Sequence, residues 1–403
     1  MLIWLCLLIP LIGSIVLLRW YKHTLVWWEV LVPLVSCFFF ILIFKFTVEK
    51  IQTSDTEYKG ALIVEARYYE YWETYVRKTC YRTVSCGKNC TRTVSYDCSY
   101  CDRNPEHWTM INSLGQEFSI TKEHYNYLRR LWKATPKFLE LNRTINRSFF
   151  GCGEDGDAYV IKWDLNPLTS KSTTQANSYE NRVQAAHSAF DFLDVTEKDV
   201  KEYKLFEYPE IERYGQENVL GLDSIPNIPR NKIDTFKILA SYLNGKLGPE
   251  KHARIYFLFF EAKDQLSASM QEAYWDGGND NELVICIGID SKTQNLNWVK
   301  PFSWTPNRQV IPEIREEIMS IGKLDPVAIC NRVEGVVRAK YKRKDFKEFS
   351  YLSVDPPEWS IWVTAILTAI ITFLLSRWAT INDMGNNGDT GGDFFRRKRN
   401  YRW

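Results

Sequence analysis

Residues 81–101 read YRTVSCGKNCTRTVSYDCSYC. The pentapeptides YRTVS (81–85) and TRTVS (91–95) are nearly identical, and the segment between them, CGKNC (86–90), contains Gly and Asn, two residues that favour turns. The flanking residues are rich in the β-branched and aromatic side chains that a pleated strand prefers. The stretch therefore predicts a β-hairpin closed at residues 87–89.

The cysteines of this region allow two interpretations. With the hairpin turn centred on Lys88, Cys80 lies opposite residue 96 and one diagonal step from Cys98, a separation that a disulfide can bridge. The candidate disulfide residues are Cys80, Cys86, Cys90, Cys98, Cys101 and Cys152. The alternative is a structural zinc ion, because the C-x2-C spacing suits that metal; its ligands would be Cys86, Cys90, Cys98 and Cys101. An oxidising compartment favours disulfides.

Three apolar segments predict transmembrane helices. Residues 1–18 contain no charged side chain, residues 25–44 contain only Glu29, and residues 359–375 contain none. Each is close to the length that crosses the hydrocarbon layer as a helix. The sequence thus predicts a multi-pass membrane protein with two spans in residues 1–46 and a third near the C-terminus.

Basic residues predict the orientation of these spans. The short loop between the first two spans contains Arg19 and Lys22, and the positive-inside rule places such a loop in the cytoplasm. The N-terminus is then outside, the tail 376–403 is cytoplasmic, and the large domain is extracytoplasmic. The basic segment 340–347 opposes this orientation, but long domains follow the charge rule poorly.

The large domain divides by composition near residue 150. Residues 51–150 predict a Cys-rich β module followed by a helix, which Thr121 can cap and whose apolar face would include Tyr125 and Leu128. Residues 151–350 predict an α/β domain whose core covers about 231–350. The predicted fold class is therefore α+β or α/β, with three transmembrane helices, a β-hairpin module and a helix-covered mixed sheet.

Within this α/β region, the segment 231–248 predicts a helix that Gly245 can terminate, and ARIYFLFF (253–260) predicts a central strand apolar on both faces. ELVICIGI (282–289) predicts a second buried strand, and NLNWVKPFSW (295–304) a third. Two further helices follow.

This order resembles the TPM domain. The resemblance is carried by RIYFLFFEA (254–262) and SMQEAYWDGGNDNELVICIGI (269–289), which would form a strand, a helix ending in Trp, a Gly-containing turn and the next strand. It extends to the C-terminal span and the Gly-rich tail NDMGNNGDTGGD (382–393). NWVKPFSW (297–304) replaces the glycine-bearing strand end of that family. The resemblance implies a domain that often lies outside the cytoplasm, with relatives described as phosphatases or as assembly, repair and accessory factors.

Acidic residues around the second buried strand are the candidate catalytic groups: Asp276, Asp280, Glu282 and Asp290. Carboxylates near strand ends can hold Ca²⁺ or Mg²⁺ and so position a phosphate. The alternative interpretation is that Asp, Asn and Gly here simply form the turn before the strand. No triad, nucleophile elbow or phosphate-binding loop motif occurs in the sequence.

Composition restricts the partners. The 51 basic and 49 acidic residues give a net charge of +2, which argues against a nucleic-acid-binding protein. The expected partners are membrane lipid and a protein outside the cytoplasm, with no cofactor favoured. The sequence predicts an accessory protein that binds or organises a partner, and a metal-dependent phosphatase is the alternative.

Overall fold

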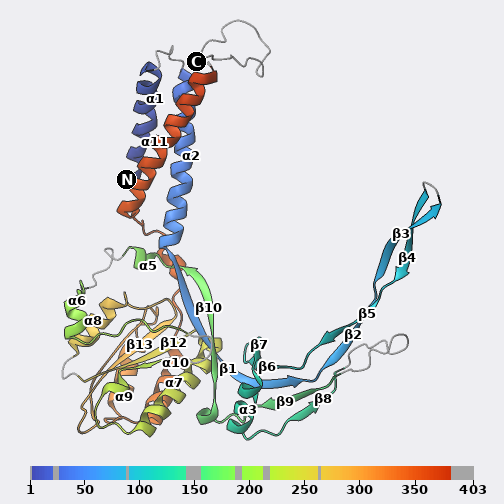
Figure 1. Ribbon diagram of the computed structural model, residues 1–403. Helices are drawn as coiled ribbons and strands as arrows, with labels where there is room; N and C mark the ends of the chain where they lie inside the picture. The colour runs from blue at the N-terminus through green and yellow to red at the C-terminus, as the bar shows by residue number, and fades with distance from the viewer. Residues whose placement is uncertain are drawn as a thin grey trace. The chain divides into compact units, whose positions relative to one another are not determined.

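The computed structural model describes residues 2–20, 27–87, 90–141, 156–186, 193–211, 218–261 and 265–382 (Figure 1). They belong to two units. The first comprises Met1–Asp55, Tyr179–Asp191 and Phe346–Trp403, and the second comprises Thr56–Ser178 and Phe192–Asp345. Helices and antiparallel sheets occur together, so the predicted mixed α and β class is confirmed.

The first unit is built on three helical segments that pack against one another (Figure 1). They are η1 and α1 (Leu2–Leu7 and Leu8–Trp20), α2 (Trp27–Gln52) and α11 (Glu358–Asn382), and the short helices α5 (Arg182–Ala185) and η5 (Phe346–Phe349) complete the unit. Among the described residues, Val30–Gln52 and Glu358–Ala379 are long and apolar enough to cross a membrane. The helix Ile3–Leu17 is apolar but shorter. Two of the three predicted spans therefore have the required length and composition.

The interior of this bundle is lined by small hydroxyl side chains. Helix α11 buries one at every fourth position: Ser360, Thr364, Thr368, Thr372 and Ser376. The Cys37 sulfur of α2 lies 3.8 Å from the hydroxyl of Thr372, and a Cβ atom added to Gly13 of α1 would lie 3.4 Å from the methyl group of Thr372. The outward face of α11 carries large apolar side chains, among them Trp362 and Ile366. Small residues inside and large apolar residues outside are the pattern of helices packed in lipid.

The second unit contains a six-stranded sheet and the helix that covers it. The strands are β1 (Ser54–Tyr69), β6 (His107–Asn112), β7 (Glu117–Ile120), β8 (Lys137–Leu139), β9 (Ala158–Lys162) and β10 (Ser172–Glu180). Their order is β7-β6-β1-β9-β8, and β10 also pairs with β1. The sheet therefore takes strands from both sides of the predicted boundary near residue 150.

Helix α3 (Lys122–Leu131) packs on this sheet as the sequence predicts. The Thr121 hydroxyl accepts a hydrogen bond from the backbone N–H of His124, which caps the helix. Tyr125 and Leu128 are buried in the same apolar cluster as Met110 of β6. Both the predicted cap and the predicted apolar face are confirmed.

A long two-stranded arm extends from β1 and β6 (Figure 1). Its inner part pairs β2 (Trp72–Val76) with β5 (Tyr100–Asn104), and its outer part pairs β3 (Thr79–Gly87) with β4 (Cys90–Asp97). In every pair from Glu65–Ile111 to Ser85–Thr91, the sequence numbers of the two partners sum to 176. One register therefore runs from the sheet to the tip. The predicted hairpin is confirmed, and the register shifts only at Gly87, which pairs with Cys90.

The remainder of the second unit is a helix-covered mixed sheet. Strands β11 (Val219–Leu220), β12 (Arg254–Phe260) and β13 (Glu282–Ile289) are parallel, and β14 (Leu296–Phe302) is antiparallel to β13. One face packs in the large apolar core with α7 (Arg230–Lys251), α9 (Val310–Met319) and α10 (Pro326–Lys340), and the other packs with α8 (Leu266–Tyr274). The short elements are η2 (Pro167–Thr169), α6 (Glu197–Glu202) and η4 (Leu222–Ser224).

The sequence predicts that Gly245 terminates its helix, and this prediction is wrong. Helix α7 continues to Lys251 and ends at His252, whose φ is 53°. The glycines of α7 instead allow β1 to approach the helix closely. A Cβ atom on Gly248 would lie 2.3 Å from the carbonyl oxygen of Gly60, and one on Gly60 would lie 2.6 Å from the carbonyl oxygen of Asn244. Gly245 is a packing residue as well, because a Cβ atom there would lie 2.6 Å from Cδ2 of Leu62 in β1.

The space around each glycine predicts opposite effects for two Gly→Ala substitutions in helices. Gly248→Ala forces β1 away from α7 and is expected to destabilise the chain by about 1–3 kcal/mol, as overpacking does. Gly335→Ala lies in α10, where an added Cβ meets no atom within 4 Å, and is expected to stabilise by about 0.5–1 kcal/mol through helix propensity. Thermal unfolding of the detergent-solubilised chain, followed by circular dichroism, measures both. An unchanged melting temperature for Gly248→Ala would contradict the close contact.

Candidate functional site

The four candidate acids lie at two opposite ends of β13. Asp276 is in the preceding turn with φ of 49°, and Asp280 and Glu282 lie at the amino end of the strand. Asp290 follows the carboxyl end, where its carboxylate accepts hydrogen bonds from the backbone of Lys292 and the hydroxyl of Thr293. The strand between them has 8 residues and so spans roughly 25 Å. These acids do not form one site.

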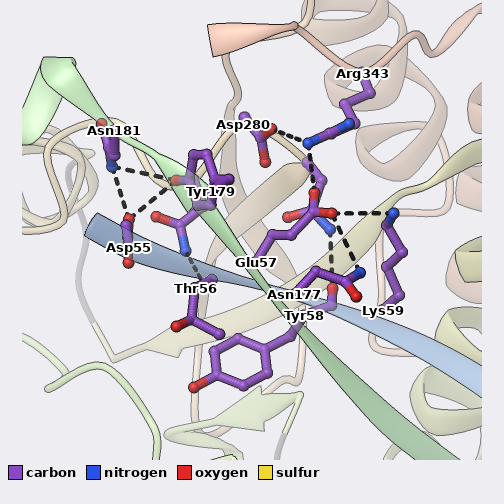
Figure 2. A network of polar contacts seen from close by, with 12 residues as sticks. Asp55, Thr56, Glu57, Tyr58, Lys59, Asn177, Tyr179, Asn181, Asp280 and Arg343 are labelled. Atoms are coloured by element: carbon purple, nitrogen blue, oxygen red, sulfur yellow. Dashed lines mark hydrogen bonds and ion pairs between the residues drawn. The ribbon is translucent and has the colours of Figure 1, made fainter. Parts of the chain in front are cut away.

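Asp280 instead belongs to a buried cluster of charges (Figure 2). The Arg343 guanidinium pairs with both Asp280 and Glu57, and its Nη2 lies 2.7 Å from Glu57 Oε2. Glu57 also pairs with Lys59 at 3.0 Å and accepts a hydrogen bond from the Asn177 amide at 3.3 Å. The Glu57 and Asp280 side chains are 5% and 1% exposed. The cluster joins the start of β1, the turn before β13 and the segment after α10.

The environment of Asp280 favours its protonated form. Burial of the carboxyl is the main cause that raises its pKa to about 7, and the neighbouring Glu57 carboxylate raises the pKa as well, whereas Arg343 lowers it. Two buried carboxylates thus share one guanidinium, and the attraction to Arg343 does not offset the loss of water. Near neutral pH, the charge of this cluster changes with the protonation of Asp280.

Glu282 belongs to a second buried network at the same, amino end of β13. Its carboxylate accepts hydrogen bonds from the Tyr208 hydroxyl and, at 2.9 Å, from the backbone N–H of Asn279. Arg254 Nε donates to the Tyr256 hydroxyl at 2.6 Å, and that hydroxyl donates to Tyr208 at 3.2 Å. Burial raises the pKa of both tyrosines, so they remain neutral donors.

The arrangement of these acids favours a structural role. Ligands of open α/β sheets bind at the carboxyl ends of the strands, whereas Asp280 and Glu282 lie at the amino end, each with hydrogen-bonding partners. Among the described residues, no three His, Cys, Asp or Glu side chains are grouped to hold a metal ion. The metal-dependent phosphatase alternative therefore has no geometric support from these four acids.

Sequence reasoning missed Glu57, Arg254 and Arg343, which complete the two networks. Arg254 and Glu282 offered a signal, because each is a single charged residue that opens an otherwise apolar strand. The two residues pair in register across β12 and β13, and both are 1% exposed. Glu57 and Arg343 lie far apart in the sequence and have no local pattern.

The arm cysteines form disulfides. Cys80 is bonded to Cys98, with 5.8 Å between the Cα atoms, and Cys80 pairs in register with Tyr96. The predicted diagonal bridge is thereby confirmed. Cys86 and Cys101 are disulfide-bonded as well. The zinc alternative needs free thiolates at Cys86, Cys98 and Cys101, so the disulfide interpretation is favoured. Cys152 lies outside the described residues, as does the Cys90 side chain.

Nearly every described side chain of the outer part of the arm is exposed. Every described side chain of β3 except Cys80 is exposed, and Tyr81 is 72% exposed. On β4 the side chains of Arg92 and Tyr96 are also exposed. Because a lone β ribbon has two faces and no core, its side chains are available for binding. The arm is the candidate functional site.

Comparisons with known proteins give no assignment: no family model, no curated protein and no solved structure matches the chain. The TPM resemblance therefore stays a prediction.

The buried cluster predicts a pH-dependent stability that Asp280 controls. In an unfolded chain this carboxyl has a pKa of about 3.9. From that value up to its folded pKa of about 7, the folded state holds a proton that the unfolded state has lost. The contribution of Asp280 to stability therefore falls as the pH rises from about 4 to about 7 and is lost above that value.

Asp280→Asn removes this contribution. Relative to the unmodified chain, the variant is expected to become progressively more stable from about pH 4.5 to about pH 7 and to gain little above it, as measured by denaturant unfolding at a series of pH values. A difference in unfolding free energy that does not vary with pH would contradict the raised pKa.

Proposed function

We propose that this chain is a multi-pass membrane protein whose large domain lies outside the cytoplasm and binds a partner through the disulfide-stapled arm. The proposed role is that of an accessory or organising protein. The single observation that carries it is the arm itself, a β ribbon that extends beyond its sheet and whose outer part exposes both faces. Residues 72–85 alone correspond to roughly 40 Å of extended strand.

The first unit supports membrane anchoring through its side-chain distribution. Its helices bury hydroxyl and small residues, such as Ser14 and Thr368, and expose large apolar ones. In water this would leave a large apolar surface uncovered, which soluble proteins avoid. Helix α1 shares the pattern, since Ile12 and Val16 are exposed, and this supports the proposal of a third span.

The arm disulfides support an extracytoplasmic domain. Structural disulfides persist in oxidising compartments and are rare where thiols are kept reduced. The proposed topology has the N-terminus outside, three spans, and the tail 376–403 in the cytoplasm. The charges of Arg19 and Lys22 in the first loop support the same orientation.

Thiol labelling tests this topology. In intact cells that produce the protein, a membrane-impermeant maleimide is expected to label the arm cysteines only after an impermeant reductant is added. An Asn386→Cys variant, with its new thiol in the tail, should be labelled at that position only after permeabilisation. Labelling of the tail in intact cells, or of the arm without any reductant, would contradict the topology or the disulfides.

Site-specific photocrosslinking tests the binding role. A photoreactive phenylalanine analogue is placed at Tyr81 or Tyr96 of the arm, and at Phe138 of β8 as the control. Phe138 is an aromatic residue of the same unit that is 59% exposed. In membranes of the native host, we expect lipid or protein adducts from the two arm positions and none from the control. Equal adduct yields at all three positions would mean that the arm is not the contact element.

A further inference from the structure

The outer hairpin, Thr79–Asp97, separates its side chains by chemical type onto two faces. Directly paired residues of an antiparallel ribbon lie on the same face, and the face alternates along each strand. Arg82 pairs with Val94, and Val84 pairs with Arg92. This face, named here the cationic face, consists of Cys80, Arg82, Val84, Arg92, Val94 and Tyr96.

The opposite face of the hairpin is a ladder of hydroxyl groups. It consists of Thr79, Tyr81, Thr83, Ser85, Thr91, Thr93 and Ser95, with Asp97 at the inner end. The near-repeat of YRTVS and TRTVS produces this separation, because antiparallel pairing places each Arg of the repeat opposite the Val of the other copy. Arginine and aliphatic residues therefore alternate in a checkerboard on one face only.

The charge of this segment has one sign. From residue 77 to residue 96 the sequence contains Arg77, Lys78, Arg82, Lys88 and Arg92 and no acidic residue. The Arg82 guanidinium lies 5.7 Å from the centre of the Tyr96 ring, a contact that supports it along the ribbon. The chain as a whole is nearly neutral, at +2, so this is a local concentration of positive charge.

The cationic face continues the face that forms the core at the base of the ribbon. The register places Ala66, Tyr68, Trp108 and Met110 on the same side, and there they pack in the apolar cluster under α3. At the tip no residue of this side belongs to an apolar cluster of the described residues; Val84 is 37% and Tyr96 46% exposed, and Val94 is partly exposed. The aliphatic residues of the tip therefore serve no core within the described part of the chain.

We propose that the cationic face binds an anionic lipid surface. This inference rests on the binding role proposed for the arm and names its partner. Guanidinium groups pair with lipid phosphates, while valine and tyrosine side chains between them enter the boundary between headgroups and acyl chains. The apolar stems of Arg82 and Arg92 lie in the same boundary with their charges at the phosphates.

Two other occupants fit the observations less well. A second copy of the arm would bring together two segments 77–96 with five positive charges each, and like charges repel. An acidic protein strand would pair through the backbone edges, or its carboxylates would meet the arginines, and neither contact requires Val84 and Val94 on the arginine face. A lipid surface uses the charge and the aliphatic groups together.

The test uses the full chain in nanodiscs of phosphatidylcholine, which is neutral overall. Flotation then measures binding of these nanodiscs to vesicles of phosphatidylcholine alone or with 30% phosphatidylglycerol. We expect binding to the anionic vesicles only. The double variant Arg82→Gln/Arg92→Gln is expected to bind at least tenfold more weakly. The matched control Arg308→Gln/Arg315→Gln removes the same charge from exposed positions outside the arm and should bind like the unmodified chain.

A second variant separates lipid from other polyanions. Val84→Thr/Val94→Thr keeps the β-branched shape and the charge, and it makes the cationic face resemble the hydroxyl face. It is expected to weaken vesicle binding several-fold, and to leave binding to soluble polyglutamate, itself weak, unchanged. Intact disulfide mass and an unchanged circular dichroism spectrum show that each variant is folded.

The outcomes distinguish this inference from the binding role on which it rests. Binding to polyglutamate but not to anionic vesicles overturns the lipid proposal and leaves an acidic protein as the partner. Vesicle binding unaffected by the arginine variant also overturns it. If photocrosslinks at Tyr81 and Tyr96 persist while vesicle binding is absent, the arm binds something else and only the lipid assignment fails. If those crosslinks are absent too, the binding role of the arm fails with it.

Discussion

The single register that runs from β1 and β6 to the tip is the constraint on which the whole arm depends. An isolated two-stranded ribbon is marginally stable in water, because it has no core to offset the entropy of ordering its backbone. Here the base is fixed within a six-stranded sheet, and the Cys80–Cys98 bond joins the strands again further out. The inner part of the arm is thus fixed by the sheet at one end and by the disulfide at the other. The side chains of the outer hairpin do not need to pack in a core.

The base itself is fixed by β1, which combines two kinds of contact. Gly60 lets the strand approach α7 until backbone meets backbone, and Glu57 places a carboxylate beside Arg343 and Asp280. Buried ion pairs contribute little net stability, but removing one partner is costly because the other charge remains buried. The cluster therefore specifies where β1 lies more than it stabilises the chain. The strand that leads into the arm is positioned by shape and charge together.

The local parts of this structure could be predicted from sequence, and the long-range parts could not. The hairpin, its register and the Cys80–Cys98 bridge follow from a repeat and a turn within twenty residues or so, and the Thr121 cap acts over three residues. Gly245 was misinterpreted because a glycine that ends a helix and a glycine that admits a strand have the same sequence signal. The acids around β13 were grouped because they are near in sequence, although a strand separates its two ends by its whole length. Glu57 and Arg343 become neighbours only through the tertiary fold.

The composition of the outer hairpin has no explanation within the fold. Threonine suits an exposed strand as well as valine does, and the hydroxyl face shows that this ribbon accepts threonine and serine at nearly every position. Folding alone would therefore permit the same residues on both faces. Instead one face alternates arginine with valine, which exposes aliphatic groups to water and concentrates repelling charges, and both features are unfavourable for an isolated hairpin. A partner that binds the positive charges and also covers the exposed aliphatic side chains would account for both unfavourable features.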